Sequence, residues 1–281
     1  MWVIGISLVL FLLFFRKAYR NTFDVSIQRI EVPVKLPRGE ELRILQLSDM
    51  HLERLSITPE HLYSLIQGEE VDLIALTGDQ IEQKRNIEPF MEYIRILKKI
   101  NPRLGIYVIF GNHDYLMRKE NLLLFRRRLE EEGCVVMQNE NLTLPFGGTN
   151  LNIIGIDDYS TRRSDIRKSY QGTHPDGINL ILTHDPNLVL QMKEAPFDYL
   201  ISGHFHGGQI HWPKPYHLAK MGKLARMNIV KGLHYMDDSP FYISEGLGQT
   251  GINIRTGSRP EITIHILRGT GIAEEKMAEA I

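Results

Sequence analysis

Five short apolar runs in this chain each end at residues that commonly bind metal ions. The runs cover residues 42–47, 71–76, 106–110, 180–182 and 199–201. Runs of this length and composition are typical of buried strands. Because the carboxyl ends of parallel strands meet at one edge of an open α/β sheet, the side chains that follow them should converge there. The segments that follow the runs read Ser48-Asp49-Met50-His51, Thr77-Gly78-Asp79, Gly111-Asn112-His113-Asp114, Thr183-His184-Asp185 and Ser202-Gly203-His204-Phe205-His206.

Two aspartates, one asparagine and four histidines of these segments form a nitrogen-and-oxygen ligand set. Neutral imidazole with carboxylate or amide oxygen suits manganese, iron or zinc better than calcium. In an extended segment, residues i and i+2 point the same way, so Asp49 with His51, and His204 with His206, can each present two ligands. Two divalent ions about 3.5–4 Å apart need a bridging anion, and Asp79 at the tip of its strand is the natural candidate. A water held by such a pair loses a proton near neutral pH and becomes a nucleophile.

The composition limits the class of protein. The 281 residues are 43% hydrophobic and 24% charged, which is ordinary for a globular protein with a substantial core. The net charge of −1 gives no electrostatic argument for nucleic acid, and no nucleic-acid partner is expected. Cys134 is the single cysteine, so the chain can form neither an intrachain disulfide nor a thiolate zinc site. Nothing in the pattern predicts a protein partner.

Residues 1–20 predict a membrane anchor with a basic flank. Residues 1–15 are almost wholly apolar. As a helix they would be about 22 Å long, against roughly 30 Å for the hydrocarbon core, and the stems of Arg16 and Lys17 could lengthen the span. No basic residue precedes the run and no small-x-small cleavage site follows it, unlike a secretory signal. The positive-inside rule then predicts localisation at the cell membrane with a cytoplasmic catalytic domain, and a cleaved or buried segment is the alternative.

The remaining sequence predicts strands and helices in alternation, then more closely spaced strands. Residues 21–41 are expected to be a linker or first strand, 42–268 one folded domain and 269–281 a polar tail. Apolar residues at helical spacing in 59–67, 89–100 and 122–132 lie between the first strands, which indicates parallel strands with right-handed crossovers. From residue 135 the connections shorten, which favours a second sheet with more antiparallel character. Its strands, and the last of the chain, are expected at 141–144, 151–156, 178–182, 199–201, 241–244 and 261–267.

The five polar blocks resemble those of the calcineurin-like metallophosphoesterases. The family pattern of D-x-H, G-D, G-N-H-D or E, a lone H and G-H-x-H occurs in order between Asp49 and His206. The resemblance implies an α/β fold over residues 42–268, a four-layer α-β-β-α sandwich of two mixed sheets, here with an N-terminal hydrophobic helix. It implies a hydrolase of phosphoester substrates with two divalent ions (Mn, Fe or Zn) as cofactors. One ion would be held by Asp49, His51 and His206, and the other by Asn112, His184 and His204, with Asp79 bridging them.

The same resemblance implies two catalytic residues. His113 would lie near the scissile phosphate, where it stabilises charge or protonates the leaving oxygen, and Asp114 would orient its ring. General acid catalysis of this kind contributes about 10²–10⁴ in rate.

Within the family, the chain is most similar to a membrane-associated bacterial branch. Residues 203–209 read GHFHGGQ, where members often have threonine in place of Phe205, and residues 246–251 read GLGQTG. The side chain of Phe205 is expected to point away from the ligand histidines. Some relatives cleave phosphodiesters, and some hydrolyse the pyrophosphate of a lipid-linked UDP-sugar. We therefore expect a phosphodiesterase or pyrophosphatase that acts on a membrane or lipid-linked substrate. The alternatives are a soluble-type nucleotide or nucleic-acid phosphodiesterase, and a non-catalytic scaffold of the same fold.

Other motifs have structural interpretations. Asp157 and Asp158 end a strand and are expected to form a turn or cap. Residues 246–251 match the dinucleotide fingerprint G-x-G-x-x-G, but no helix pattern follows, so a dinucleotide site is rejected. Residues 214–231 carry five basic residues and no acid. They could lie on anionic lipid, hold a phosphate-bearing headgroup or form a solvated loop. The basic residues of 162–168 are expected to lie in a solvated loop.

Overall fold

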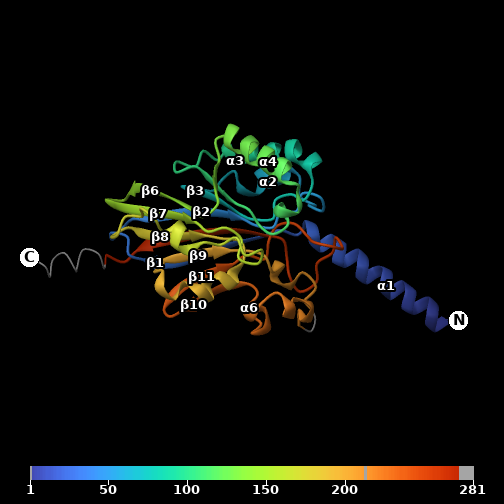
Figure 1. Cartoon of the computed structure of the whole chain (residues 1–281). Coiled ribbons are helices and arrows are strands. Elements are labelled where there is room, and N and C mark those ends of the chain that lie inside the picture. The colour runs from blue at the N-terminus through green and yellow to red at the C-terminus, as the bar shows by residue number, and fades with distance from the viewer. Residues whose placement is uncertain (1, 212–213, 272–281) are drawn as a thin grey trace, which may run out of the picture.

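The computed structural model describes residues 2–211 and 214–271 and contains two six-stranded sheets (Figure 1). The first sheet has the order β1 (Ser26–Val34), β12 (Glu261–Gly269), β2 (Glu41–Leu47), β3 (Leu73–Thr77), β4 (Ile106–Ile109) and β5 (Val135–Met137). Strands β2 to β5 are parallel, as the alternation of strands and helices predicts. β12 pairs antiparallel with β2 and parallel with β1, so the last strand lies between the first two.

The second sheet is parallel in its middle and antiparallel at both edges. Its order is β10 (Gly232–Met236), β11 (Ser239–Ile243), β9 (Tyr199–Ser202), β8 (Ile178–Leu182), β7 (Thr149–Gly155) and β6 (Glu140–Phe146). The β10–β11 and β6–β7 pairs are antiparallel, whereas the first sheet has one antiparallel pair. The antiparallel character expected of the second sheet is therefore confined to its edges. The central strands β7, β8 and β9 are parallel, and the two strands that precede the histidine segments therefore end at the same edge.

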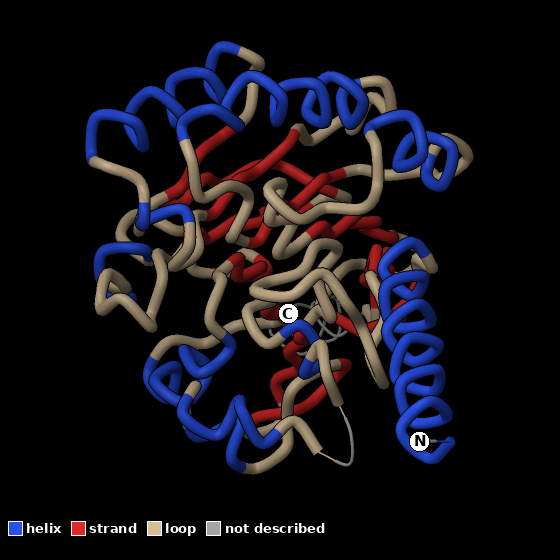
Figure 2. Tube along the Cα trace, turned by 90° about the vertical axis from the view of Figure 1, so that its right-hand side faces the viewer, coloured by secondary structure: helices blue, strands red, loops and turns tan. Residues whose placement is uncertain are grey.

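Helices cover the outer faces of both sheets, which confirms the four-layer α-β-β-α sandwich (Figure 2). The buried apolar side chains form three clusters, one between the sheets and one beneath the helices on each outer face. The first sheet is covered by α2 (Pro59–Ile66), α3 (Ile87–Lys98) and α4 (Lys119–Glu131), close to the expected ranges. The remaining helical segments are η1 (Asn21–Phe23), η2 (Lys84–Asn86), η3 (Asp114–Leu116), α5 (Ile166–Ser169), η4 (Pro186–Glu194), η5 (His206–Gly208), η6 (Tyr216–Lys220) and α6 (Lys223–Arg226).

The N-terminal helix α1 (Trp2–Arg20) projects from one end of the sandwich (Figure 1). Its base is attached where Ala18, which is buried, accepts a hydrogen bond of 2.9 Å from the backbone N–H of Arg255. Apolar side chains from Leu8 to Phe14 are more than half exposed. A transmembrane anchor is expected here from the sequence, but none of the helices in residues 2–211 and 214–271 is long and apolar enough to cross a bilayer.

The segments beside the domain are partly strand. Residues 26–34, within the region expected to be a linker or first strand, form β1. Gly269, where the expected polar tail begins, is the last residue of β12, and residues 272–281 of that tail lie outside the described residues.

A buried polar cluster ties the two sheets together next to the carboxyl edge. His265 on β12 contacts the hydroxyl of Tyr199 through Nδ1 at 2.8 Å and Oε1 of Gln46 through Nε2 at 2.9 Å. Gln46 in turn donates from Nε2 to the hydroxyl of Thr77 at 2.8 Å and to the carbonyl of Ser202 at 2.9 Å. Burial lowers the pKa of His265 to about 3, so this ring is neutral at ordinary pH. The cluster fixes the ends of β2, β3 and β9 relative to one another.

Candidate metal centre

Loops at the carboxyl ends of five strands bring the seven expected ligands together. Strands β2, β3 and β4 of the first sheet and β8 and β9 of the second end at the same place. All but one of the seven side chains belong to buried residues, and Asn112 is half-buried. The groups follow their strands in the order Asp49 and His51 (β2), Asp79 (β3), Asn112 (β4), His184 (β8), and His204 and His206 (β9).

The backbone at five of these seven residues is in the left-handed region, which residues other than glycine rarely adopt. A conformation of this kind is retained where the surroundings hold it, and such residues cluster at functional sites. Backbone bonds from Asp49 N–H to the Gly78 carbonyl and from His51 N–H to the Asp79 carbonyl, both 2.9 Å, join the first two loops. The φ angles are 51° at Asp49, 39° at His51, 55° at Asp79, 75° at His204 and 51° at His206.

Two glycines are required by the closeness of the loops. A Cβ atom on Gly203 would lie 1.9 Å from the hydroxyl of Ser48 and 2.2 Å from Oδ2 of Asp49. A Cβ atom on Gly111 would lie 2.3 Å from Oδ1 of Asp79. The glycines of the G-N-H-D and G-H-x-H blocks therefore allow the ligand carboxylates to approach the neighbouring loops.

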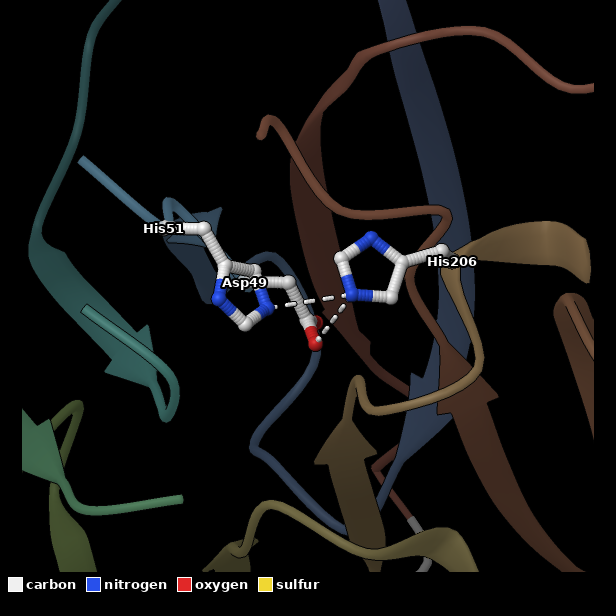
Figure 3. A group of neighbouring side chains, drawn as sticks. All are labelled: Asp49, His51 and His206. Atoms are coloured by element: carbon white, nitrogen blue, oxygen red, sulfur yellow. Dashed lines mark hydrogen bonds and ion pairs between the residues drawn. The ribbon is translucent and has the colours of Figure 1, made fainter. Parts of the chain in front are cut away.

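Asp49, His51 and His206 form the first group of expected ligands (Figure 3). Nε2 of His51 lies 3.2 Å from Nε2 of His206, which lies 3.3 Å from Oδ1 of Asp49. The Asp49 carboxylate also accepts hydrogen bonds from the Ser48 hydroxyl at 2.6 Å and the His204 N–H at 3.0 Å. Burial alone would raise the pKa of Asp49, but the nearby His206 and His184 outweigh it and the pKa is lowered. Asp49 is therefore an ionised, rigidly held carboxylate.

His184, His204 and Asn112 form the second group. Nε2 of His184 lies 3.2 Å from Oδ1 of Asn112 and 3.1 Å from Nδ1 of His204. Nδ1 of His184 lies 2.9 Å from the carbonyl of Thr77, which can only accept, so this nitrogen carries the proton and Nε2 is left for a metal ion.

Asp79 lies between the two groups. Its Oδ2 atom is 3.5 Å from Nε2 of His51 and 3.2 Å from Nε2 of His184. Its Oδ1 atom accepts a hydrogen bond of 2.7 Å from the backbone N–H of His113. Burial raises the pKa of Asp79, but His184 and His51 outweigh it and the pKa is lowered far below its usual range. One ionised oxygen thus faces both groups, which is the arrangement expected of a bridging ligand.

The donor set fits a pair of divalent ions. Atoms bonded to one ion at about 2.1 Å lie about 3.0–3.4 Å from one another, close to the 3.1–3.5 Å contacts of this cluster. The imidazole nitrogens of His51 and His206 that face each other at 3.2 Å can both be satisfied by a shared cation. Burial lowers the pKa of His206 to about 3, which keeps it in the neutral form that binds metals.

His113 is held by a residue that the sequence analysis did not identify. Its Nδ1 atom lies 2.9 Å from Oε1 of Glu82, which is 3.3 Å from Nη1 of Arg54 and 3.5 Å from Nδ1 of His51. The pKa of Glu82 is lowered to about 2, first by the adjacent His51 and further by His113 and Arg54, so Glu82 is ionised. The signal that could have found Glu82 is its position three residues after Asp79, in the same loop as a ligand.

The expected contact between Asp114 and the ring of His113 is wrong. The Asp114 carboxylate instead accepts four backbone N–H groups at 2.8–3.0 Å, from Asp79, Gln80, Ile81 and Gly111. A buried carboxylate satisfied in this way joins the loop after β3 to the loop after β4. Asp114 therefore fixes the backbone of two ligand loops. Glu82 makes the contact with the His113 ring that was expected of Asp114.

Residues 246–251 support the first ligand loop from the opposite side. The N–H of Leu247 donates to the Ser48 carbonyl at 2.9 Å, and that of Gly248 to the Asp49 carbonyl at 2.8 Å. The fully buried guanidinium of Arg255 donates to the carbonyls of Gly246 and Gly248 at 2.8 and 2.6 Å. The next regular element is strand β12, so this segment lacks the helix of a dinucleotide site. The close backbone approach that its glycines allow is toward Asp49.

Asp158 closes a turn as expected, and Asp157 and Asp185 also make structural contacts. Asp158 accepts hydrogen bonds from the Ser160 hydroxyl and the Thr161 N–H, both 2.8 Å, and so closes a turn. Asp157 accepts from the hydroxyl of Tyr115 at 2.5 Å. Asp185 caps η4 by accepting from the backbone N–H of Asn187 at 2.8 Å.

A cleft of about 360 Å³ opens above the ligands. Phe205, the residue after His204, lies in the wall of the cleft, and its ring is 5.4 Å from the His204 ring. Its side chain packs in the outer core of the second sheet, away from the ligand cluster. No substrate-binding residues were assigned from the sequence. The cleft is lined by Asp79, Asn112, His113, His204 and His206 and by Phe205, Gln209, Ile210, His217, Leu218, Lys220, Met221, Thr250 and Ile252.

Comparison with known proteins identifies the family. Residues 42–208 match the family model described as calcineurin-like phosphoesterase. The metallophosphoesterase YkoQ of Bacillus subtilis (strain 168) is 55% identical over 94% of this chain and 98% of its own length. The UDP-2,3-diacylglucosamine pyrophosphatase LpxG of Chlamydia muridarum (strain MoPn / Nigg) is 26% identical over 83% of this chain and 85% of its own. A transmembrane protein with metallophosphoesterase domain from Bos taurus is 28% identical over 86% of this chain and 57% of its own. This chain therefore belongs to the calcineurin-like phosphoesterase family.

Proposed function

We propose that this phosphoesterase uses two divalent ions to hydrolyse a phosphodiester or a diphosphate. The observation that carries the proposal is Asp79 Oδ2, a single oxygen that faces histidine nitrogens of both ligand groups. Asp49, His51 and His206 would hold one ion, and Asn112, His184 and His204 the other. Manganese, iron and zinc all suit this donor set.

The side chains around the cleft have separate roles in this reaction. Two divalent ions, when bound, supply Lewis-acid charge and a water of lowered pKa. His113 lines the cleft with Nδ1 engaged by Glu82, so its Nε2 is the nitrogen left for the substrate. From there it can donate a proton to the departing oxygen. Glu82 orients the ring, and Asp114 keeps the two loops at the right separation.

We extend the proposal to a substrate that is membrane-bound or carries a lipid. The cleft has apolar walls, and at its rim Ile210 and Ile252 are 39% and 60% exposed. The same rim segment holds the base of α1 through the bond between Arg255 and Ala18, and Figure 2 looks onto the end from which α1 projects. The relative LpxG is named for a substrate that is a diphosphate with two acyl groups, which agrees with a cleft of this character.

We also propose that α1 associates with a lipid surface through its exposed apolar side chains. The variant Leu10→Asp/Leu13→Asp should sediment less with lipid vesicles than the unaltered protein, because charged side chains oppose burial in the acyl region. Leu123→Asp places a charge on an apolar side chain of α4 that is equally exposed, at 56%, and serves as the control. Equal sedimentation of all three proteins would contradict the lipid association. The cytoplasmic location expected from the sequence stays a prediction.

The test of the proposed activity is turnover of bis-p-nitrophenyl phosphate by purified protein with added manganese, iron or zinc. We expect activity with at least one of the metals and none in Asp79→Asn, which loses the bridging charge. A folded protein that is inactive with every metal would contradict the proposal. Membrane lipids, lipid-linked nucleotides and soluble nucleotides then distinguish the proposed substrate from that of a soluble-type phosphodiesterase.

A further inference from the structure

Arg255 is a fully buried cation behind the ligand cluster, and it forms no ion pair with any residue that the structure describes. Burying a charge without an opposite partner is costly, so the groups that satisfy this guanidinium are of interest. It donates five hydrogen bonds of 2.6–3.0 Å, to the carbonyls of Glu245, Gly246, Gly248 and Arg259 and to the hydroxyl of Ser258. The planar fork of an arginine can serve this many acceptors at once.

One side of the guanidinium holds the turn that packs against Asp49. Nη2 of Arg255 donates to the carbonyls of Gly246 and Gly248 at 2.8 and 2.6 Å. The N–H of Gly248 donates in turn to the Asp49 carbonyl at 2.8 Å. A Cβ atom on Gly246 would lie 2.8 Å from the Cβ atom of Asp49, and one on Gly248 would lie 1.8 Å from the Met50 carbonyl oxygen. The turn is therefore in direct contact with the ligand segment, and a displacement of the turn would displace Asp49.

The other side of the guanidinium reaches His206 through a single hydroxyl. Nη1 of Arg255 donates to the buried hydroxyl of Ser258 at 3.0 Å, and this hydroxyl donates to the His206 carbonyl at 3.0 Å. Asp49 follows a strand of the first sheet and His206 a strand of the second, and their side chains meet from different strands (Figure 3). One side chain thus supports two ligands of the same group that come from different sheets.

The backbone of Arg255 is bonded to the base of α1, where the helix leaves the sandwich (Figure 1). Its N–H donates to the Ala18 carbonyl at 2.9 Å, and its carbonyl accepts from Nδ2 of Asn21 in η1 at 2.8 Å. The next residue, Thr22, is buried, and its hydroxyl lies 2.7 Å from the hydroxyl of Ser56. The docked base of α1 therefore fixes the backbone from which the guanidinium extends.

This support is one-sided. In the described part of the chain, no hydrogen bond of Arg255 reaches the segments that carry Asn112 and His184. His184 is held instead by the Thr77 carbonyl, which lies 2.9 Å from its Nδ1. Of the second group, only His204 shares a loop with a residue that Arg255 supports. Loss of these hydrogen bonds should therefore disturb the first group of ligands more than the second.

We propose that Arg255 is a positioning residue that keeps Asp49 and His206 at the spacing needed by the ion of the first group, and that links this spacing to the docked base of α1. The inference rests on the proposed function, in which Asp49, His51 and His206 hold one of two ions. Arg255 acts through the backbone of residues 246–248 and through the Ser258 hydroxyl. Groups that orient metal ligands typically contribute about 10–100-fold in metal affinity.

Three variants of the full chain interrupt this network at different points. Arg255→Lys keeps the positive charge, but its single ammonium cannot serve five acceptors, so a loss would come from the hydrogen bonds and not from the charge. Ser258→Ala breaks the link to His206, and Asn21→Ala breaks the side-chain bond from η1 to the Arg255 carbonyl. Ser169→Ala is the control, because it removes a fully buried hydroxyl in α5 that donates to a backbone carbonyl at 2.8 Å.

The test is calorimetric titration of metal-free protein with manganese, in two backgrounds that each retain one group of ligands. His184→Ala keeps the first group, and His51→Ala keeps the second. We expect Arg255→Lys to lower manganese affinity about 10–100-fold in the His184→Ala background and less than about threefold in the His51→Ala background. Ser258→Ala and Asn21→Ala each remove one hydrogen bond and should lower only the first affinity, by about two- to tenfold. Ser169→Ala should change neither affinity.

Urea unfolding of the same metal-free proteins distinguishes positioning from a merely structural role. If Arg255→Lys lowers both affinities equally along with stability, the role is structural and the inference is refuted. Unchanged affinities in Arg255→Lys and Ser258→Ala would also refute it, while two ions bound to the unaltered protein would leave the proposed function standing. Should Arg255→Lys fail to fold, Ser258→Ala decides by the same criteria. An unaltered protein that never binds two ions would overturn both proposals.

Discussion

Glu82→Gln is the substitution that most sharply separates a positioning role from a structural one. It keeps the size of the side chain and removes the negative charge 2.9 Å from Nδ1 of His113. A carboxylate that orients a functional histidine typically contributes 10–100-fold, and general acid catalysis as a whole about 10²–10⁴. We therefore expect kcat to fall about 10–100-fold, which corresponds to about 1.4–2.7 kcal/mol in the barrier, with KM nearly unchanged.

The leaving group identifies the cause of that loss. p-Nitrophenol departs with little help from an acid, whereas an alkyl alcohol needs a proton, so the loss should be larger for an alkyl phosphodiester. In a His113→Asn background, Glu82→Gln should cause little further loss, because the two residues act as one unit. Glu82→Asp should recover part of the activity.

Metal content must be measured alongside, because Glu82 also lies 3.5 Å from Nδ1 of His51. We expect the metal content of Glu82→Gln to match that of the unaltered protein. Equal losses for good and poor leaving groups, or losses that add fully in the double variant, would refute the positioning role.

Three further substitutions test the support of the site and the core. Gly203→Ala should lower metal content and reduce activity at least about 100-fold, because its Cβ would lie 2.2 Å from Oδ2 of Asp49. Gly68→Ala, where a Cβ would meet open space, should change neither metal content nor activity. Full activity of Gly203→Ala would contradict the close packing. Asp114→Asn should cost about 2–5 kcal/mol in urea unfolding, because its amide would face two N–H donors; a loss below about 1 kcal/mol would contradict this role. In the folded protein His265 has a pKa of about 3, whereas in the unfolded chain a histidine binds a proton below about pH 6.5. Its contribution to stability is therefore complete above that pH and is lost as the pH falls, at about 1.4 kcal/mol per unit or about 2 kcal/mol at pH 5. His265→Gln should flatten the stability profile between pH 7 and 5 by that amount, and an unchanged slope would count against it.

The pattern of strands and ligand blocks was predictable because both depend on local sequence. Apolar runs followed by polar residues identify strand ends, and the run before Asp79 is buried along all of β3. The order of strands then brings the ligands to one edge without further information. The seven ligands were predicted only from the residues that follow each strand, and the geometry of the cluster is consistent with that prediction.

Contacts between loops could not be predicted in this way. Asp114 is adjacent to His113 in sequence, yet its carboxylate turns to backbone N–H groups of the neighbouring loop and Glu82 reaches the ring instead. A groove of about 1210 Å³ is a similar case, since Arg162 and Arg226, which both line it, lie 64 positions apart in the sequence and only the folded chain places them on one surface. Strand β10, which is only partly buried, also lacks a strong apolar pattern.

The central claim is that seven side chains hold two ions that share Asp79. The most direct measurement is electron paramagnetic resonance of the manganese-loaded protein, with the metal content determined on the same sample. We expect two manganese ions per chain and the multiline spectrum of an exchange-coupled pair, as ions about 3.5–4 Å apart produce. In Asp79→Asn the coupling should disappear. A single ion per chain, or two ions with the spectrum of isolated manganese, would contradict the shared centre.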